Sequence, residues 1–133
     1  MSAFAARFAA AAASLVGTPF RLHGRDPATG LDCVGLVASG LEIAGRSPPV
    51  LPDYTLRNLS IARFLGLLTE LGLESVTGPA GPGDLLLCKP GPGQFHLGIA
   101  SDEETVIHAH AGVGRVVAAP WLWPQAGHWR FTH

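Results

Sequence analysis

The spacing of apolar residues changes near the middle of the chain, and this change constrains the fold more than any other feature. Up to Gly72, apolar residues recur every three or four positions, as they do in amphipathic helices. Beyond the loop GPAGPG they form short runs separated by turn residues, which is typical of strands. Helices followed by strands predict an α+β domain with the helices packed against one side of an antiparallel sheet.

Three segments carry the helical pattern. In the first, Phe4, Phe8 and Leu15 share one face, which favours a helix of the folded domain over the secretory signal that its Ala-rich sequence imitates. The second begins after Asp32, a helix-capping residue, and ends at Gly45. The third has Ile61, Leu65, Leu68 and Leu71 on one face and ends at Gly72.

Five strands are predicted after the loop, arranged as a meander in which each strand pairs with the next. They cover residues 84–89, 95–100, 105–110, 115–119 and 128–132. The loop is not a domain linker, because too few residues follow it to build a second core. We therefore expect a single domain over residues 1–133.

Composition excludes several classes of function. Nine Lys and Arg balance ten Asp and Glu, and no stretch combines basic with aromatic residues, so a nucleic-acid partner is not expected. No apolar run approaches the roughly 20 residues of a membrane span. Two cysteines, Cys33 and Cys88, are too few for a disulfide framework, and Cys88 lies in an apolar strand typical of the core.

Cys33 is the clearest candidate for a reactive side chain. It lies in the first turn of the second helix, where unpaired N–H groups and the helix dipole stabilise a thiolate. By position alone, a buried structural cysteine is an equal alternative. Asp32 next to it is interpreted as the helix cap rather than as a catalytic acid, because a neighbouring carboxylate disfavours a thiolate.

A nucleophilic cysteine needs a base and a third group that orients the base. His96 opens the strand HLGIA, on the same face as Gly98, whose lack of a side chain leaves room for a substrate. His108 and His110 share a face of the next strand, and the pattern does not choose between them as the orienting group. These histidines and a cysteine are also compatible zinc ligands, but no CxxC or HExxH cluster supports a metal site.

Five motifs occur in the order GTPF, LDCVGL, PGDLLL, HLGIA and VIHA. In this order they resemble the NlpC/P60 domains, over a stretch from Leu15 to about Arg130. The resemblance implies a papain-like fold, with Cys33 as nucleophile, His96 as base and His108 as the orienting residue. It further implies a thioester mechanism without a cofactor, acting on the stem peptide of peptidoglycan, most often at the bond between D-glutamate and a diamino acid.

One position departs from the family pattern. Many members have a tyrosine in the GTP-Tyr loop, whose hydroxyl can help to hold the oxyanion, and here the residue is Phe20. Loss of one such donor can lower the rate about 100-fold or more. Arg21, His23 and the backbone N–H of Cys33 are candidate replacements, and the helix start favours the backbone N–H.

The chain is most similar to short members encoded among the tail genes of phages and gene transfer particles. This similarity predicts synthesis in the cytoplasm without a clear signal peptide, and a tail or virion component that acts on the periplasmic wall. The alternative is a tail structural or adaptor protein that keeps the fold with weak or no catalysis, for which Phe20 is the argument. A lowered thiol pKa would favour the enzyme.

Three tryptophans lie near the C-terminus. Trp121, Trp123 and Trp129 could form a groove wall or contact a partner, but ordinary packing under a loop is the favoured interpretation.

Overall fold

The computed structural model describes residues 2–47, 61–89, 95–121 and 125–133, with the backbone alone over 61–65. Three helices lie in this part of the chain: α1 (Ala3–Ser14), α2 (Cys33–Ala44) and α3 (Ile61–Glu70). The eight strands found there are β1 (Arg25–Asp26), β2 (Gly30–Leu31), β3 (Leu73–Ser75), β4 (Leu85–Cys88), β5 (His96–Ala100), β6 (Thr105–His110), β7 (Arg115–Pro120) and β8 (Gln125–Phe131). The predicted α+β class with three helices is confirmed. Trp123 lies outside the described residues.

Local capping signals define the first two helices. The Ser2 hydroxyl accepts a hydrogen bond from the backbone N–H of Ala5 (3.0 Å), and Asp32 caps α2 as predicted. Gly45 ends α2 with a φ of 104°, a left-handed conformation that glycine adopts without strain.

The main sheet is antiparallel and has six strands in the order β3-β8-β4-β5-β6-β7. The meander is confirmed from β4 to β7, but β8 pairs with β4 instead of β7, and β3 adds an edge strand that the sequence did not indicate. β3 is three residues long and buries only Leu73, so it shows no alternation that could be recognised. Its pairing with β8 joins Leu73 to Phe131 across a long separation in sequence.

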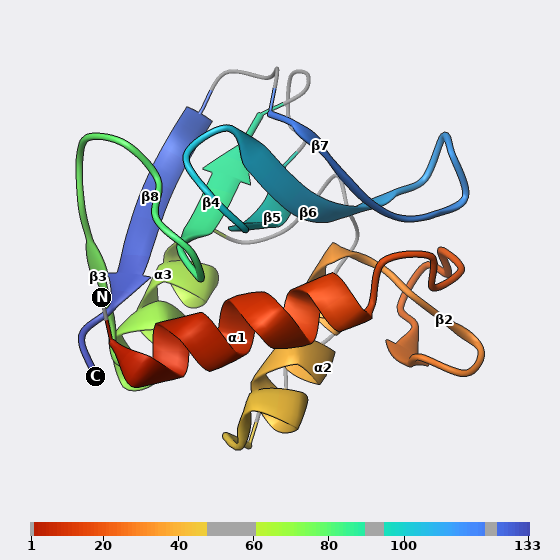
Figure 1. Ribbon diagram of the computed structural model, residues 1–133, viewed down its shortest axis with the longest axis horizontal. Helices are drawn as coiled ribbons and strands as arrows, with labels where there is room; N and C mark the ends of the chain where they lie inside the picture. The colour runs from red at the N-terminus through yellow and green to blue at the C-terminus, as the bar shows by residue number, and fades with distance from the viewer. Residues whose placement is uncertain (1, 48–60, 90–94, 122–124) are drawn as a thin grey trace.

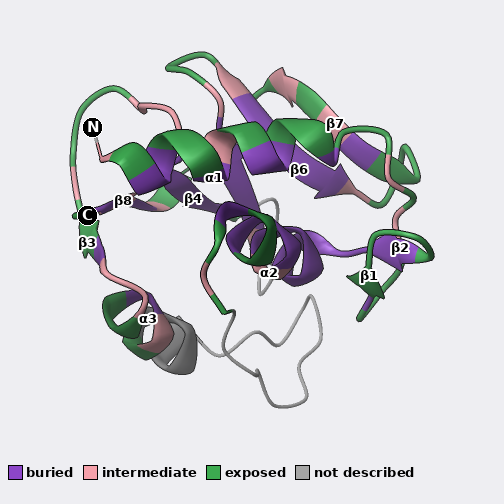
Figure 2. Cartoon of the chain, turned by 60° about the horizontal axis from the view of Figure 1, so that its bottom comes forward, coloured by how far each residue is buried: buried purple, intermediate pink, exposed green. Residues whose placement is uncertain are grey.

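The core lies between the sheet and the first two helices, which run together along one side of it (Figure 1). Phe4 and Phe8 of α1 both meet the Phe131 ring edge-on, with centroids 4.9 and 5.3 Å apart. This burial confirms that the first segment is a helix of the domain. α2 is buried on most of its surface, whereas α1 keeps one exposed face (Figure 2).

α3 packs differently from the other two helices. It contacts the edge strand β3, close to both chain ends in the view of Figure 1, and contributes Leu68 to the core. No helix in the described ranges has the length and apolar character needed to cross a bilayer.

Candidate active site

Asp32 fixes the start of α2 against the preceding loop. Its buried carboxylate accepts hydrogen bonds from the backbone N–H of Gly35 (2.8 Å), the backbone N–H of His23 (2.8 Å) and Nη1 of Arg25 (3.0 Å). His23 adopts a φ of 61°, which turns its backbone toward this carboxylate. The interpretation of Asp32 as a cap is confirmed, and both carboxylate oxygens accept hydrogen bonds from within the domain.

Gly35 explains why glycine stands two residues after the cysteine. A Cβ at this position would lie 2.0 Å from the carbonyl oxygen of Gly24, a backbone atom that cannot move aside independently. The absence of a side chain therefore lets the loop lie directly on the first turn of α2, where the cysteine is held.

We expect Gly35→Ala to destabilise the protein by about 2 kcal/mol, although alanine is the better helix former by about 1 kcal/mol. The matched control is Gly66→Ala in α3, where the described residues beyond the adjoining helix backbone place no atom within 4 Å of the added carbon, so the same change should stabilise. Denaturant unfolding of both variants checks the signs. Equal shifts in the same direction would show that the contact with Gly24 does not limit the site.

Cys33 lies at the start of α2 with 1% of its surface exposed. Burial, and next the charge of Asp32, raise the pKa of its thiol to about 12, while backbone N–H groups of Leu97, Val34 and Cys33 act in the opposite direction. Desolvation therefore outweighs the helix start, so the free protein does not favour the expected thiolate, and the lowered thiol pKa that would favour the enzyme over a tail structural protein is not seen. The contact with Leu97 places the thiol beside the residue that follows His96.

His96 and His108 form a direct pair. Nε2 of His96 lies 3.0 Å from Nδ1 of His108, and the two rings are nearly perpendicular at 86°. Burial, followed by the charge of neighbouring histidines, lowers the pKa of each imidazole to about 4, so both are neutral at pH 7. If His96 donates from Nε2, its Nδ1 carries the lone pair that a general base needs.

His110 lies two residues further along β6 and makes a different contact. Its Nδ1 accepts a hydrogen bond from the backbone N–H of Val113 (3.1 Å), which fixes the turn before β7. Of the two candidates for orienting His96, the structure thus places His108 at hydrogen-bond distance. Its role in catalysis remains a prediction.

The remaining predicted site residues lie on the loop before α2. The half-buried Phe20 packs against the core and bridges to Leu31, while Arg21 and His23 are exposed. Cys88 is a free, buried cysteine opposite His96 in the pairing of β4 with β5. In the described part of the chain, no three His, Cys, Asp or Glu side chains group as metal ligands.

The sequence favours ordinary packing for Trp121 and leaves a groove wall as the alternative, and the structure places this residue against the histidine pair. Its ring lies parallel to that of His96, with centroids 5.9 Å apart and an interplanar angle of 11°, and meets His108 edge-on at 5.3 Å. Trp121 also lines a cavity of about 380 Å³ together with His128, Glu103 and Glu104. No local signal in the sequence indicates this position, because it depends on where the chain goes after β7.

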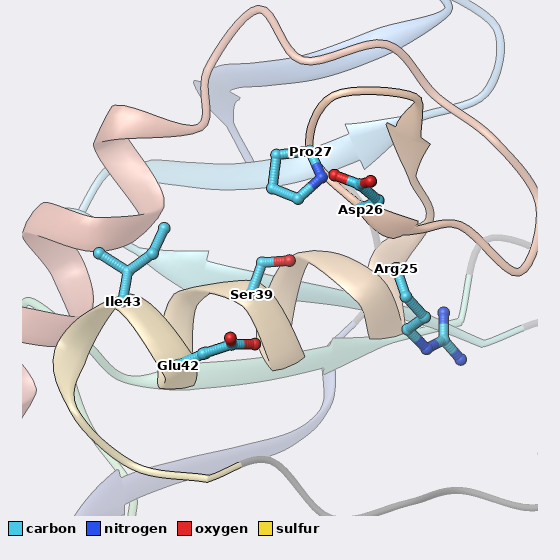
Figure 3. Close-up of a pocket in the computed structure, with 6 residues that line it drawn as sticks. All are labelled: Arg25, Asp26, Pro27, Ser39, Glu42 and Ile43. Carbon is cyan, nitrogen blue, oxygen red and sulfur yellow. The ribbon is translucent and has the colours of Figure 1, made fainter.

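A second cavity, of about 530 Å³, lies between the β1–β2 hairpin and α2 (Figure 3). The helix contributes Ser39, Glu42 and Ile43, and the hairpin faces them with Asp26 and Pro27. These helical residues lie beyond the first turn of α2, so this cavity is not the position of the thiol.

The fold and the site together define a papain-like α+β domain with a cysteine at a helix start and a histidine pair on the sheet. The family model of NlpC/P60 matches residues 17–122, and the chain belongs to the NlpC/P60 family. No functionally curated protein matches it at a significant level.

Solved structures of the same family share the fold. The NlpC/p60 domain of the peptidoglycan hydrolase SagA is 26% identical with a TM-score of 0.66, and the match covers 96% of this chain and 98% of that one. The peptidoglycan hydrolase RipB from Mycobacterium tuberculosis is 19% identical with a TM-score of 0.64, and the match covers 95% of this chain and 63% of RipB. NlpC2 from Trichomonas vaginalis is 15% identical with a TM-score of 0.70, and the match covers 98% of this chain and 49% of NlpC2. The chain thus spans about half of NlpC2.

Proposed function

We propose that this chain is a cysteine peptidase that hydrolyses the stem peptide of peptidoglycan, with Cys33 as nucleophile, His96 as base and His108 as the residue that orients His96. The observation that carries the proposal is the 3.0 Å His96–His108 contact beside a cysteine whose thiol meets the backbone N–H of Leu97, in an NlpC/P60 domain. Two structural relatives, SagA and RipB, are named as peptidoglycan hydrolases, which supports the choice of substrate.

The protonation states favour activation by a general base over a preformed ion pair. With a thiol pKa of about 12 and an imidazole pKa of about 4, Cys33 and His96 are both neutral at rest. His96 takes the thiol proton as sulfur attacks the peptide carbonyl, and then gives that proton to the leaving amine. Water, deprotonated by the same imidazole, hydrolyses the thioester and regenerates the thiol.

The oxyanion needs a donor in place of the tyrosine hydroxyl that Phe20 cannot supply. The backbone N–H groups of Cys33 and Val34 lie at the free end of α2 and close enough to the sulfur to lower its pKa. They are fixed by the capped helix, so they need no rearrangement during the reaction.

The bond and the place of action follow from the resemblance. We propose cleavage between D-glutamate and the diamino acid, by a protein that reaches the periplasmic wall as part of a phage-like tail. Mass spectrometry of peptidoglycan fragments after incubation with the chain tests the first part, because the product masses identify the bond. Intact fragments would favour the alternative of a tail structural or adaptor protein.

The pH profile follows from the same pKa values. We expect kcat/KM to stay flat from about pH 5 to about pH 9 and to fall in acid as His96 gains a proton near its pKa of about 4. Cleavage of a soluble stem peptide across this range measures it. An alkaline decrease near pH 8 would instead indicate an imidazolium in the resting enzyme and contradict the neutral pair.

Unfolding of the protein at acid pH would also lower the measured activity, so the pH profile needs a control for stability. His96 and His108 have lowered pKa values in the folded state, so the unfolded chain binds more protons between about pH 6.5 and about pH 4. Stability must therefore decrease as the pH falls through this window. Circular dichroism at each pH separates loss of activity from loss of the fold.

A further inference from the structure

The strand order determines where Trp121 lies. β7 ends at Pro120, and β8 pairs with β4 on the other side of β5 and β6. Trp121 is the first residue after β7, and its ring lies over His96 of β5 and beside His108 of β6. It thus contacts both members of the histidine pair at once.

The space for this ring is provided by Gly98. A Cβ at Gly98 would lie 2.9 Å from Cζ3 and 3.0 Å from Cη2 of Trp121, and 2.4 Å from Cγ1 of Val106. Trp121 and Val106 also belong to the small apolar cluster on this side of the sheet. The glycine two residues after His96 therefore makes room for the indole next to the imidazole, and not for a substrate as the sequence predicted.

We propose that Trp121 is a positioning residue, whose indole holds the imidazole of His96 in the plane in which Nε2 meets Nδ1 of His108. This inference rests on the proposed function of His96 as base. Without the parallel indole face, the imidazole could rotate about its side-chain bonds and water could compete for Nε2. A hydrogen bond shielded from water is electrostatically stronger, so where His96 donates from Nε2 the indole also stabilises the tautomer that leaves Nδ1 basic.

Substitution at Trp121 removes no ionisable group near His96, although His108 loses the same indole contact. The ionisable groups that remain are His108 and His110 on β6, Cys88 opposite on β4, Lys89 after β4, Arg115 opposite His110 on β7, Cys33 with Asp32 at the start of α2, and Glu103, Glu104 and His128 around the cavity that Trp121 lines. A change in the titration of His96 in a Trp121 variant thus reports the lost indole rather than a lost charge.

The test compares Trp121→Ala with Trp121→Phe, which keeps an aromatic face. NMR titration of the His96 ring in the resting protein reads its pKa and tautomer without requiring any activity. We expect Trp121→Ala to raise the pKa of His96 from about 4 by about one unit or more and to mix its tautomers, because water reaches the ring. Trp121→Phe should restore most of the native behaviour.

Kinetics give the second readout. For Trp121→Ala we expect kcat to fall about 10-fold or more with a smaller change in KM, and the acid side of the pH profile to move upward with the pKa of His96. Gly98→Ala keeps Trp121 but adds a methyl group that would push its indole away from the sheet. This variant should shift the pKa of His96 in the same direction. If Trp121→Ala is folded and the pKa and tautomer of His96 are unaltered, the proposal is overturned. The same holds if the variant is less stable to unfolding but His96 titrates as in the native protein. Because NMR reads the resting protein, failure of the chain to cleave peptidoglycan would be recognised separately.

Discussion

Replacing Cys33 by alanine is expected to abolish cleavage of peptidoglycan stem peptides, with a loss of about 10⁴-fold or more in kcat/KM. The sulfur is the atom that forms the thioester, and an alanine side chain has no nucleophilic atom to take its place. Parallel incubations of wall fragments with the native chain and the variant, followed by mass spectrometry of the products, measure the loss. The fold should persist, since the cap made by Asp32 uses the backbone of Gly35 and not the thiol.

Cys88→Ala is the matched control for this experiment. Both cysteines are free and buried, and Cys88 lies on β4 opposite His96, so the two changes remove the same atom from the same region. Only the change at Cys33 removes the thiol from the helix start beside Leu97. Cleavage by Cys33→Ala at more than about 1% of the native rate would contradict the assignment of the nucleophile.

The start of α2 was predictable because its signals are local. An Asp before an apolar helical stripe is a capping signal, and the structure shows the predicted bond from the Gly35 N–H to the Asp32 carboxylate. The same holds for β4 to β7, whose short runs and intervening turns predicted consecutive pairing.

The position of β8 and the state of the thiol were not predictable, because both depend on contacts distant in sequence. Pairing of Leu85 with Trp129 and of Leu73 with Phe131 follows from packing that no local pattern encodes. The pKa of Cys33 is raised by the burial of the first turn of α2, which depends on tertiary packing. From the sequence, the helix start predicts only the lowering of this pKa by backbone N–H groups. Trp121 reaches the histidine pair for the same topological reason.

Asp84 is the residue whose loss is expected to cost most stability. Its carboxylate is 1% exposed and accepts hydrogen bonds from Nε2 of His128 (2.6 Å), Nε and Nη2 of Arg130 (2.9 and 2.7 Å) and the backbone N–H of Gly81 (2.9 Å). These bonds tie the loop before β4 to β8, the strand that sequence analysis placed elsewhere.

We expect Asp84→Asn to lower the free energy of unfolding by about 3 kcal/mol, because the amide turns donor groups toward His128 and Arg130. For a chain of this size the melting temperature should fall by roughly 10 °C. The control is Asp102→Asn, an exposed carboxylate that accepts from the backbone N–H groups of Glu104 and Thr105 and whose amide oxygen can still do so. Its effect should stay within about 0.5 kcal/mol.

The acid dependence of stability gives an independent check on Asp84. Burial raises the pKa of this carboxyl, but the hydrogen bonds from Arg130, the Gly81 N–H and His128 outweigh it and hold the pKa below its ordinary 3.8. The unfolded chain therefore binds this proton first, so the stabilisation is present above about pH 4 and is lost as the pH falls through the folded-state pKa. Urea unfolding at a series of pH values should show that Asp84→Asn reduces the decrease that lies below about pH 4, to which Asp102 also contributes. The part between about pH 6.5 and about pH 4, which belongs to His96 and His108, should remain. An unchanged slope below pH 4 would place the acid-sensitive carboxylate elsewhere in the domain.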